Sequence, residues 1–289
     1  MHNNPISLAE GECRRIWPQI SRPDLIVSLG TGTGHPTAGK PGLVSRLWTS
    51  FMASLDGQKA WEEACNRLSE EHRVDYCRLN VELGNSMLAL DDTSCMKGIQ
   101  SLIKAQPSIR QACNDIAVSL LISSFYFELH HVIPQYSQGS YLCRGSIVCR
   151  LPGKAMDTAF RHLGQGDWAF STNYHFISHF DAEADCCFRC GLVRKSVAFR
   201  VRNPLDQFCI YMHNSEWKRQ ISGFPTSLEW FVERQGLKNP FGPLYPSAVL
   251  RCEQLCRQKN KKRKGITTQG SGGKRLRTRS YDSIKATAR

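Results

Sequence analysis

The sequence lacks the segments that would place it in a membrane or secretory class. Its longest apolar stretch, residues 117–127, is interrupted by three serines and is too short to cross a bilayer. Residues 1–20 contain Asn, Glu, Arg and Pro and no apolar core of a signal peptide. We therefore expect no transmembrane segment and a cytoplasmic location.

Acidic residues are almost absent from the C-terminal segment. Residues 257–289 hold twelve Lys and Arg against one acid, Asp282, which gives +11 of the chain's net charge of +13. Basic runs bind polyanions or anionic lipid head groups, and they also act as nuclear-import signals. With so few apolar residues, 257–289 is predicted to be a disordered basic tail. Peripheral contact with an anionic membrane or polyanion is its expected role, with nuclear location as the alternative.

The cysteines do not form the pattern of a secreted disulfide framework. There are thirteen, an odd number, and they are scattered along the chain without an accompanying signal peptide. This pattern favours a reducing compartment, in which cysteine is a small core residue or a metal ligand.

The first half of the chain has the alternation of helices and strands that is typical of an α/β domain. Asn4 and Pro5 suit the N-cap and first position of a helix. LIVSLG (25–30) is almost wholly apolar, which predicts a strand buried on both faces. Further helices are expected over 43–55, 57–72 and 96–129, the last broken at Pro107, and a further strand over 76–83.

The second half predicts a smaller antiparallel β-rich module. Its segments alternate β-branched and aromatic residues with polar ones, and turn residues separate them. Thr226 and Glu229 have the spacing of a capping box for a short helix that ends at Gly236. The expected strands are 140–151, 170–182, 192–202 and 207–213.

Two short motifs resemble the C-terminal section of the patatin-like phospholipase domain, particularly of its fungal type. An Asn-Asn-Pro begins a helix, and a strand ending in Ser-Leu-Gly-Thr-Gly follows it, in the order in which that family has them. The segment 221–237 also resembles the closing part of fungal members with an added β-rich module. The motif positions are Asn3, Asn4, Pro5, Ser28, Leu29, Gly30, Thr31 and Gly32.

The resemblance implies a three-layer α/β/α domain, truncated to its C-terminal part in residues 1–130, and then a β-rich module in 131–245. It implies hydrolysis of phospholipid or other acyl esters by a Ser–Asp dyad. The family's Gly-x-Ser-x-Gly and Asp-Gly-Gly sequences do not occur in this chain. The resemblance places them upstream of Met1, so we expect a catalytically incomplete chain with no catalytic residue of its own. The alternative is a non-catalytic binding module for a protein partner or an anionic membrane surface.

A zinc site is the one cofactor site that the residues suggest. Cys187 and Cys190 have the Cys-x-x-Cys spacing of half a structural zinc site, and His175 and His179 precede them. Cys143 and Cys149 are further possible ligands, but they do not form a second motif with the spacing of a zinc site. The alternative is that the Cys-x-x-Cys segment is a tight turn between strands.

The glycine-rich run after the first strand has two interpretations. Gly30 to Gly34 could bring backbone N–H groups to a phosphate, but the run lacks the Lys-Ser/Thr of a P-loop and the spacing of a dinucleotide fingerprint. A tight exit from a buried strand is the simpler interpretation, and it is the one we expect.

Overall fold

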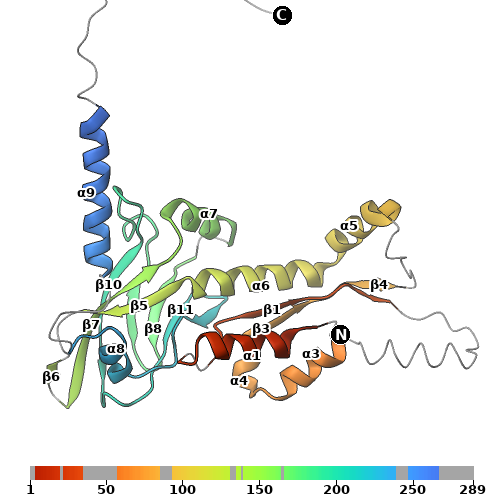
Figure 1. Ribbon diagram of the computed structural model, residues 1–289, viewed down its shortest axis with the longest axis horizontal. Helices are drawn as coiled ribbons and strands as arrows, with labels where there is room; N and C mark the ends of the chain where they lie inside the picture. Colours follow the sequence, from red (N-terminus) through yellow and green to blue (C-terminus); the bar gives the residue numbers. More distant parts are fainter. Residues whose placement is uncertain are drawn as a thin grey trace, which may run out of the picture.

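The computed structural model describes residues 4–19, 22–34, 57–84, 93–130, 135–137, 139–163, 166–238 and 247–266 (Figure 1). It shows a protein of mixed helices and sheets. The N-terminal part, red and orange in Figure 1, lies beside a β-rich part in green and cyan. The long helix α6 runs from one to the other. The helix expected over 43–55 and the motif residue Asn3 lie outside the described residues.

The N-terminal part contains two pairs of short parallel strands. β1 (Ile26–Leu29) pairs with β3 (Tyr76–Leu79), and β2 (Thr33–Gly34) pairs with β4 (Glu82–Gly84). Parallel strands joined through helices agree with the α/β pattern expected for this half. The helices are α1 (Ile6–Ile16), α3 (Gly57–Asn66), α4 (Glu70–Arg73), the 3₁₀ turn η1 (Thr93–Cys95) and α5 (Met96–Ala105).

The expectation that the first strand is buried on both faces is wrong. Within the described residues β1 has a hydrogen-bonded neighbour on one edge, β3. The Val27 and Leu29 side chains are 37% and 73% exposed, while Ile26 and Ser28 are half-buried. An apolar run shows that a strand can be covered, but the cover comes from elements that the run itself does not specify.

The start of α1 differs by one residue from the prediction, because the N-cap position is Pro5, which provides no side-chain cap, and not Asn4. The helix begins at Ile6, and the Ile6 N–H donates to Asn4 Oδ1 at 3.2 Å. Asn4 is buried, and its Nδ2 donates to the carbonyl of Gly57 at 3.1 Å, at the start of α3. The Asn4 side chain therefore links the beginnings of two helices from the position before the N-cap of α1.

The prediction of a helical segment over 96–129, broken at Pro107, is correct about the break and wrong about the last residues. α5 stops at Ala105, and α6 (Pro107–Ser123) begins at the proline. The last five residues form a strand, β5 (Phe125–Leu129), in which buried and half-buried side chains alternate. Because β5 pairs with β7, the domain boundary expected at residue 130 falls inside a sheet.

The β-rich part is built from two antiparallel sheets, as the sequence predicts. The first has the order β10-β7-β5, with β6 also pairing with β7, and the second has the order β12-β11-β8-β9. In sequence order the remaining strands are β6 (Gln135–Ser137), β7 (Ser140–Cys149), β8 (Ala169–Thr172), β9 (Phe176–His179), β10 (Arg194–Val201), β11 (Ile210–His213) and β12 (Lys218–Gln220).

Aromatic side chains fill the core of this part. Phe125 of the first sheet meets Phe170 of the second, with ring centroids 5.8 Å apart, and both are fully buried. Helix α7 (Gly153–Leu163) adds Met156 and Phe160 to the same core. Buried aromatic pairs stabilise by their area and by edge-to-face contact, so the two sheets and α7 form one packed unit.

Two helices close the β-rich part. α8 (Leu228–Arg234) is capped by Ser227, whose Oγ accepts the Trp230 N–H at 3.2 Å, so the expected cap at Thr226 is displaced by one residue. Gly236 has φ +63° just beyond the helix, as expected for a C-terminal glycine.

The final helix was not expected. α9 (Ala248–Ile266) extends ten residues into the segment expected to be a disordered tail, and it projects away from the sheets (Figure 1). The residues after Ile266 lie outside the described part of the chain.

Candidate metal centre

Four cysteines from two distant segments meet at the base of α9. Cys187 and Cys190 lie in the loop between β9 and β10, and Cys252 and Cys256 lie on α9. All four sulfur atoms are within 4.8 Å of one another. The Sγ–Sγ distances are 3.9 Å for Cys187–Cys256 and 3.5 Å for Cys190–Cys252. A tetrahedral ion with four sulfur ligands needs separations of about 3.8 Å, so the cluster could hold a metal ion.

The loop half of the cluster is shaped by its backbone. The Gly191 N–H donates to the Cys187 carbonyl at 2.7 Å, and the Cys187 N–H donates to the Leu192 carbonyl at 2.9 Å. Gly191 has φ +75°, a backbone conformation that residues with a Cβ atom rarely adopt. The resulting turn brings the two thiols of Cys-x-x-Cys to the same side.

Backbone N–H groups also point at one sulfur of this loop. Burial raises the pKa of Cys187, but hydrogen bonds from the backbone N–H groups of Cys190 and Arg189 outweigh it. With the Cys190 and Cys252 side chains, they lower the pKa of Cys187 to about 6. A thiolate is therefore favoured at neutral pH at a position where a metal ion requires one.

The helix half of the cluster follows from helical periodicity. Cys252 and Cys256 are four residues apart, so their side chains lie one above the other on one face of α9. Both are half-buried, whereas Glu253, Gln254 and Leu255 between them are exposed. The face with the cysteines is the face that α9 turns to the loop.

A second anchor holds the start of α9. The Ala248 N–H donates to Glu128 Oε2 at 2.6 Å, and Arg251 forms an ion pair with Glu128 Oε1. Arg251 Nη2 also donates to the Tyr126 hydroxyl at 2.7 Å. Glu128 and Tyr126 both belong to β5, so the first turn of α9 is tied to the first sheet and its second and third turns to the cysteine loop.

The structure brings together two of the six residues that were named as possible metal ligands. Cys187 and Cys190 are in the cluster of four, and His175 and His179 are not members of it. They belong to the β8–β9 hairpin, where extended backbone separates them from the loop. Cys143 and Cys149 are buried in β7, where burial raises the pKa of both thiols, that of Cys143 to about 12.

Sequence reasoning missed Cys252 and Cys256. Their Cys-x-x-x-Cys spacing is a signal, because it places two thiols on one helix face. The basic residues that follow from Arg257 predict a disordered segment, and this prediction outweighs the signal of the two cysteines. Within the described residues none of the thirteen cysteines forms a disulfide.

The motif residues of the N-terminal part serve the strand exit. The Gly32 N–H donates to Asn80 Oδ1 at 2.9 Å, and Arg78 Nη1 donates to Ser28 Oγ at 2.8 Å. A Cβ added to Gly30 would lie 2.2 Å from Asn80 Oδ1, so glycine is required for that approach. Leu29 and Thr31 complete this exit from β1. These contacts give Ser28, Gly30 and Gly32 a structural part at the end of β1.

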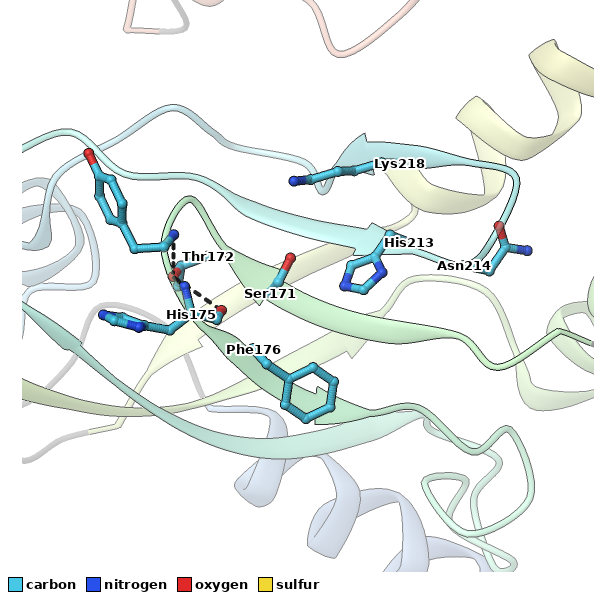
Figure 2. A pocket seen from close by; sticks show the side chains of 8 residues that line it. Ser171, Thr172, His175, Phe176, His213, Asn214 and Lys218 are labelled. Carbon is cyan, nitrogen blue, oxygen red and sulfur yellow. Dashed lines mark hydrogen bonds between the residues drawn. The ribbon is translucent and has the colours of Figure 1, made fainter.

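A hollow away from the cysteine cluster lies on the outer face of the sheet β12-β11-β8-β9 (Figure 2). Its volume is about 370 Å³. Ser171, His213 and Phe176 come from neighbouring strands in this view, and Lys218 lies across from them. The lining residues are Ser171, Thr172, Tyr174, His175, Phe176, His213, Asn214 and Lys218, which include no carboxylate.

Comparison with known proteins provides no relative from which the role of these features could be inferred. No family model, curated protein or solved structure matches this chain. Among the helices in the described part of the chain, none has the length and apolarity that crossing a membrane requires.

Proposed function

We propose that Cys187, Cys190, Cys252 and Cys256 bind one structural zinc ion. Sulfur ligands in a tetrahedral set favour zinc, and four protein ligands leave no position for water or substrate. The ion would have a structural role, because a catalytic zinc site needs an open position. The convergence of the four sulfur atoms from two segments is the observation that supports this proposal.

The function that this site would serve is that of a non-catalytic binding module. Zinc would fix α9 on the β-rich part, and α9 continues into a sequence with Lys or Arg at positions 257, 259, 261, 262, 263 and 264. A helix anchored at one end can present such a basic segment to an anionic partner. The module would therefore act by holding a concentrated positive charge at a defined place.

Metal analysis tests the zinc proposal. Protein purified without chelator should contain one zinc per chain by elemental analysis, and Cys252→Ser and Cys256→Ser should each lose it. Cys113→Ser is the matched control, because Cys113 is an exposed thiol on α6 outside the cluster. Equal zinc content in all four proteins, or none in the unaltered chain after reconstitution with zinc, would reject the site.

Salt-dependent binding tests the module itself. The full chain and a variant with Lys261→Gln, Lys262→Gln and Lys264→Gln are compared for binding to inorganic polyphosphate at low and high salt. The variant should bind more weakly and with a smaller salt dependence, because it has three fewer cations. Identical binding curves for the two proteins would show that these basic residues of α9 do not contribute to binding.

The patatin-like resemblance supplies a second candidate. We propose that residues 1–130 correspond to the C-terminal part of a three-layer lipid acyl hydrolase domain that acts on phospholipid or other acyl esters. The parallel pair β1–β3, which leads into the exit at Gly30 and Gly32, supports this proposal because such sheets carry their sites at the carboxyl ends of strands. The chain's lack of the Gly-x-Ser-x-Gly and Asp-Gly-Gly sequences predicts no turnover by this chain alone.

Esterase measurements test this second candidate. The purified chain is assayed with a chromogenic short-chain ester and with phospholipid vesicles, before and after a serine-directed fluorophosphonate. We expect no hydrolysis and no labelled serine. Hydrolysis that the fluorophosphonate abolishes, with a label on a serine of this chain, would show that the chain carries its own nucleophile.

A further inference from the structure

The outer face of the sheet β12-β11-β8-β9 has an unusual set of side chains. Phe170, Ile210 and Met212 point to the core and are fully buried, so the alternate residues of β8 and β11 face outward. The strand register aligns these residues across the sheet in two rows. They are Gln220, Tyr211, Ser171 and Phe176 in one row, and Lys218, His213, Ala169 and His179 in the other, of which Ala169 is buried.

Aromatic rings are exposed on this face. Phe176 is 57% exposed, and Tyr174, in the turn between β8 and β9, is 84% exposed. Thr172 Oγ1 accepts the N–H groups of Tyr174 at 3.3 Å and His175 at 3.0 Å, which fixes the turn (Figure 2). The Phe176 and His179 rings lie 4.9 Å apart. These exposed rings give the face apolar surface that a binding partner could cover.

Positive charge accompanies the aromatic rings. Lys218 Nζ lies 4.7 Å from the centre of the Tyr211 ring, and no carboxylate lines the hollow. Burial, then the charges of Lys218 and His179, hold the pKa of His213 below its usual range. Lys218 and His179 therefore place positive charge close to the His213 ring. A ligand with negative charge and flat apolar groups would complement both features.

We propose that the outer face of the sheet β12-β11-β8-β9 binds single-stranded nucleic acid. Bases would stack on Phe176 and Tyr174, and a phosphate would contact Lys218, as aromatic and basic groups on sheets do in other single-strand binders. The hydroxyl of Ser171 and the NH₂ group of Asn214 line the same hollow and can form hydrogen bonds with base edges, whereas Asn214 Oδ1 already accepts two backbone N–H groups of its turn. The +11 of residues 257–289 would add attraction that is independent of sequence.

The chemistry of the hollow favours this occupant over a membrane surface. Its lining residues combine rings with polar and cationic groups and include no Leu, Ile, Val or Met, so the two rings of Tyr174 and Phe176 are the apolar side chains there that could enter a lipid layer. A duplex would keep its bases stacked on one another and unavailable to the exposed rings. The inference deepens the proposed function and rests on it for the anionic nature of the partner, but it uses a different surface.

Fluorescence anisotropy with labelled oligonucleotides tests the proposal in the full chain. The probes are oligo-U and oligo-dT strands of about 12 nucleotides, a length within the range of known single-strand sites, and a duplex of equal length. Phe176→Ala and Tyr174→Ala should each weaken single-strand binding about tenfold and leave binding to inorganic polyphosphate unchanged. Trp17→Ala, which removes an exposed ring on the N-terminal part, is the matched control and should bind as the unaltered chain does.

The outcomes separate this inference from the proposed function. If both aromatic variants bind the single strands within twofold of the unaltered chain, the inference is rejected, and polyphosphate binding still reports on the basic segment. A loss of polyphosphate binding equal to the loss of single-strand binding would also reject it, since stacking would then have no part. Zinc content and circular dichroism of each variant verify that the fold is intact.

Discussion

Replacing Glu128 by Gln should loosen the attachment of α9 to the first sheet. Glu128 accepts the Ala248 N–H with one carboxylate oxygen and pairs with Arg251 through the other. Glutamine has nearly the same size, but it is neutral and turns either an oxygen or an NH₂ group to each partner. The variant therefore removes the charge-assisted part of both contacts while the packing is kept.

The structure sets the size of the expected effect. The side chain of Glu128 is 16% exposed and that of Arg251 is 39% exposed, so water screens the pair only in part. Hydrogen bonds to charged groups contribute about 1.5–3 kcal/mol each. A loss of about 2 kcal/mol corresponds to an opening of α9 that is about 30 times more frequent.

Native-state hydrogen exchange of the zinc-loaded protein measures this opening. The amide protons of the first turns of α9 should exchange about 30 times faster in Glu128→Gln than in the unaltered chain. Asp157→Asn is the control, because it neutralises an exposed carboxylate that pairs with Arg161 four residues along α7. An exposed pair of this kind contributes about 0.5 kcal/mol or less.

A specific result would contradict this reasoning. If exchange in α9 is the same in Glu128→Gln and in the unaltered chain, the contacts of Glu128 do not hold the helix. If Asp157→Asn accelerates α9 as strongly, the effect is a general response to lost charge and not a property of this anchor.

Two further predictions concern the stability of the fold and use urea unfolding as the measurement. Gly145→Ala should lower the free energy of unfolding by about 1–3 kcal/mol or more, because the added Cβ would lie 2.2 Å from the Phe127 ring and 2.4 Å from the Glu128 carbonyl. Gly98→Ala is the control and should stabilise α5 by up to about 1 kcal/mol, because no atom lies within 4 Å of its added Cβ. Equal changes in the two variants would refute the steric argument. Ser227→Ala should cost about 1 kcal/mol by removing the cap of α8, and no loss would show that water replaces the hydroxyl.

Local chemistry in the sequence was sufficient to predict much of the β-rich part. Alternating residues located β7, β10 and β11, and turn residues separated them. The apolar run that ends in Phe125–Leu129 was assigned to a helix because a continuous apolar stretch fits a buried helix as well as a buried strand. Only pairing with β7, a contact between distant residues, decides between them.

The candidate site was predictable in half for a similar reason. Cys187-x-x-Cys190 is a local motif, and its spacing identified it. The histidines chosen to complete the site were near it in sequence, whereas the structure completes it with Cys252 and Cys256, which are more than sixty positions away. Whether α9 folds back to the loop depends on Glu128 and Arg251, and the sequence gives no sign that these two residues meet.

The separation of the two cysteine pairs along the chain affects how the protein is made. Cys190 and Cys252 are 62 residues apart, and the strands β10, β11 and β12 lie between them. During translation both thiols of the loop emerge from the ribosome before those strands are synthesised. The four-sulfur centre can be completed only after Cys256 has left the exit tunnel, so α9 is the last piece of the β-rich part to take its place.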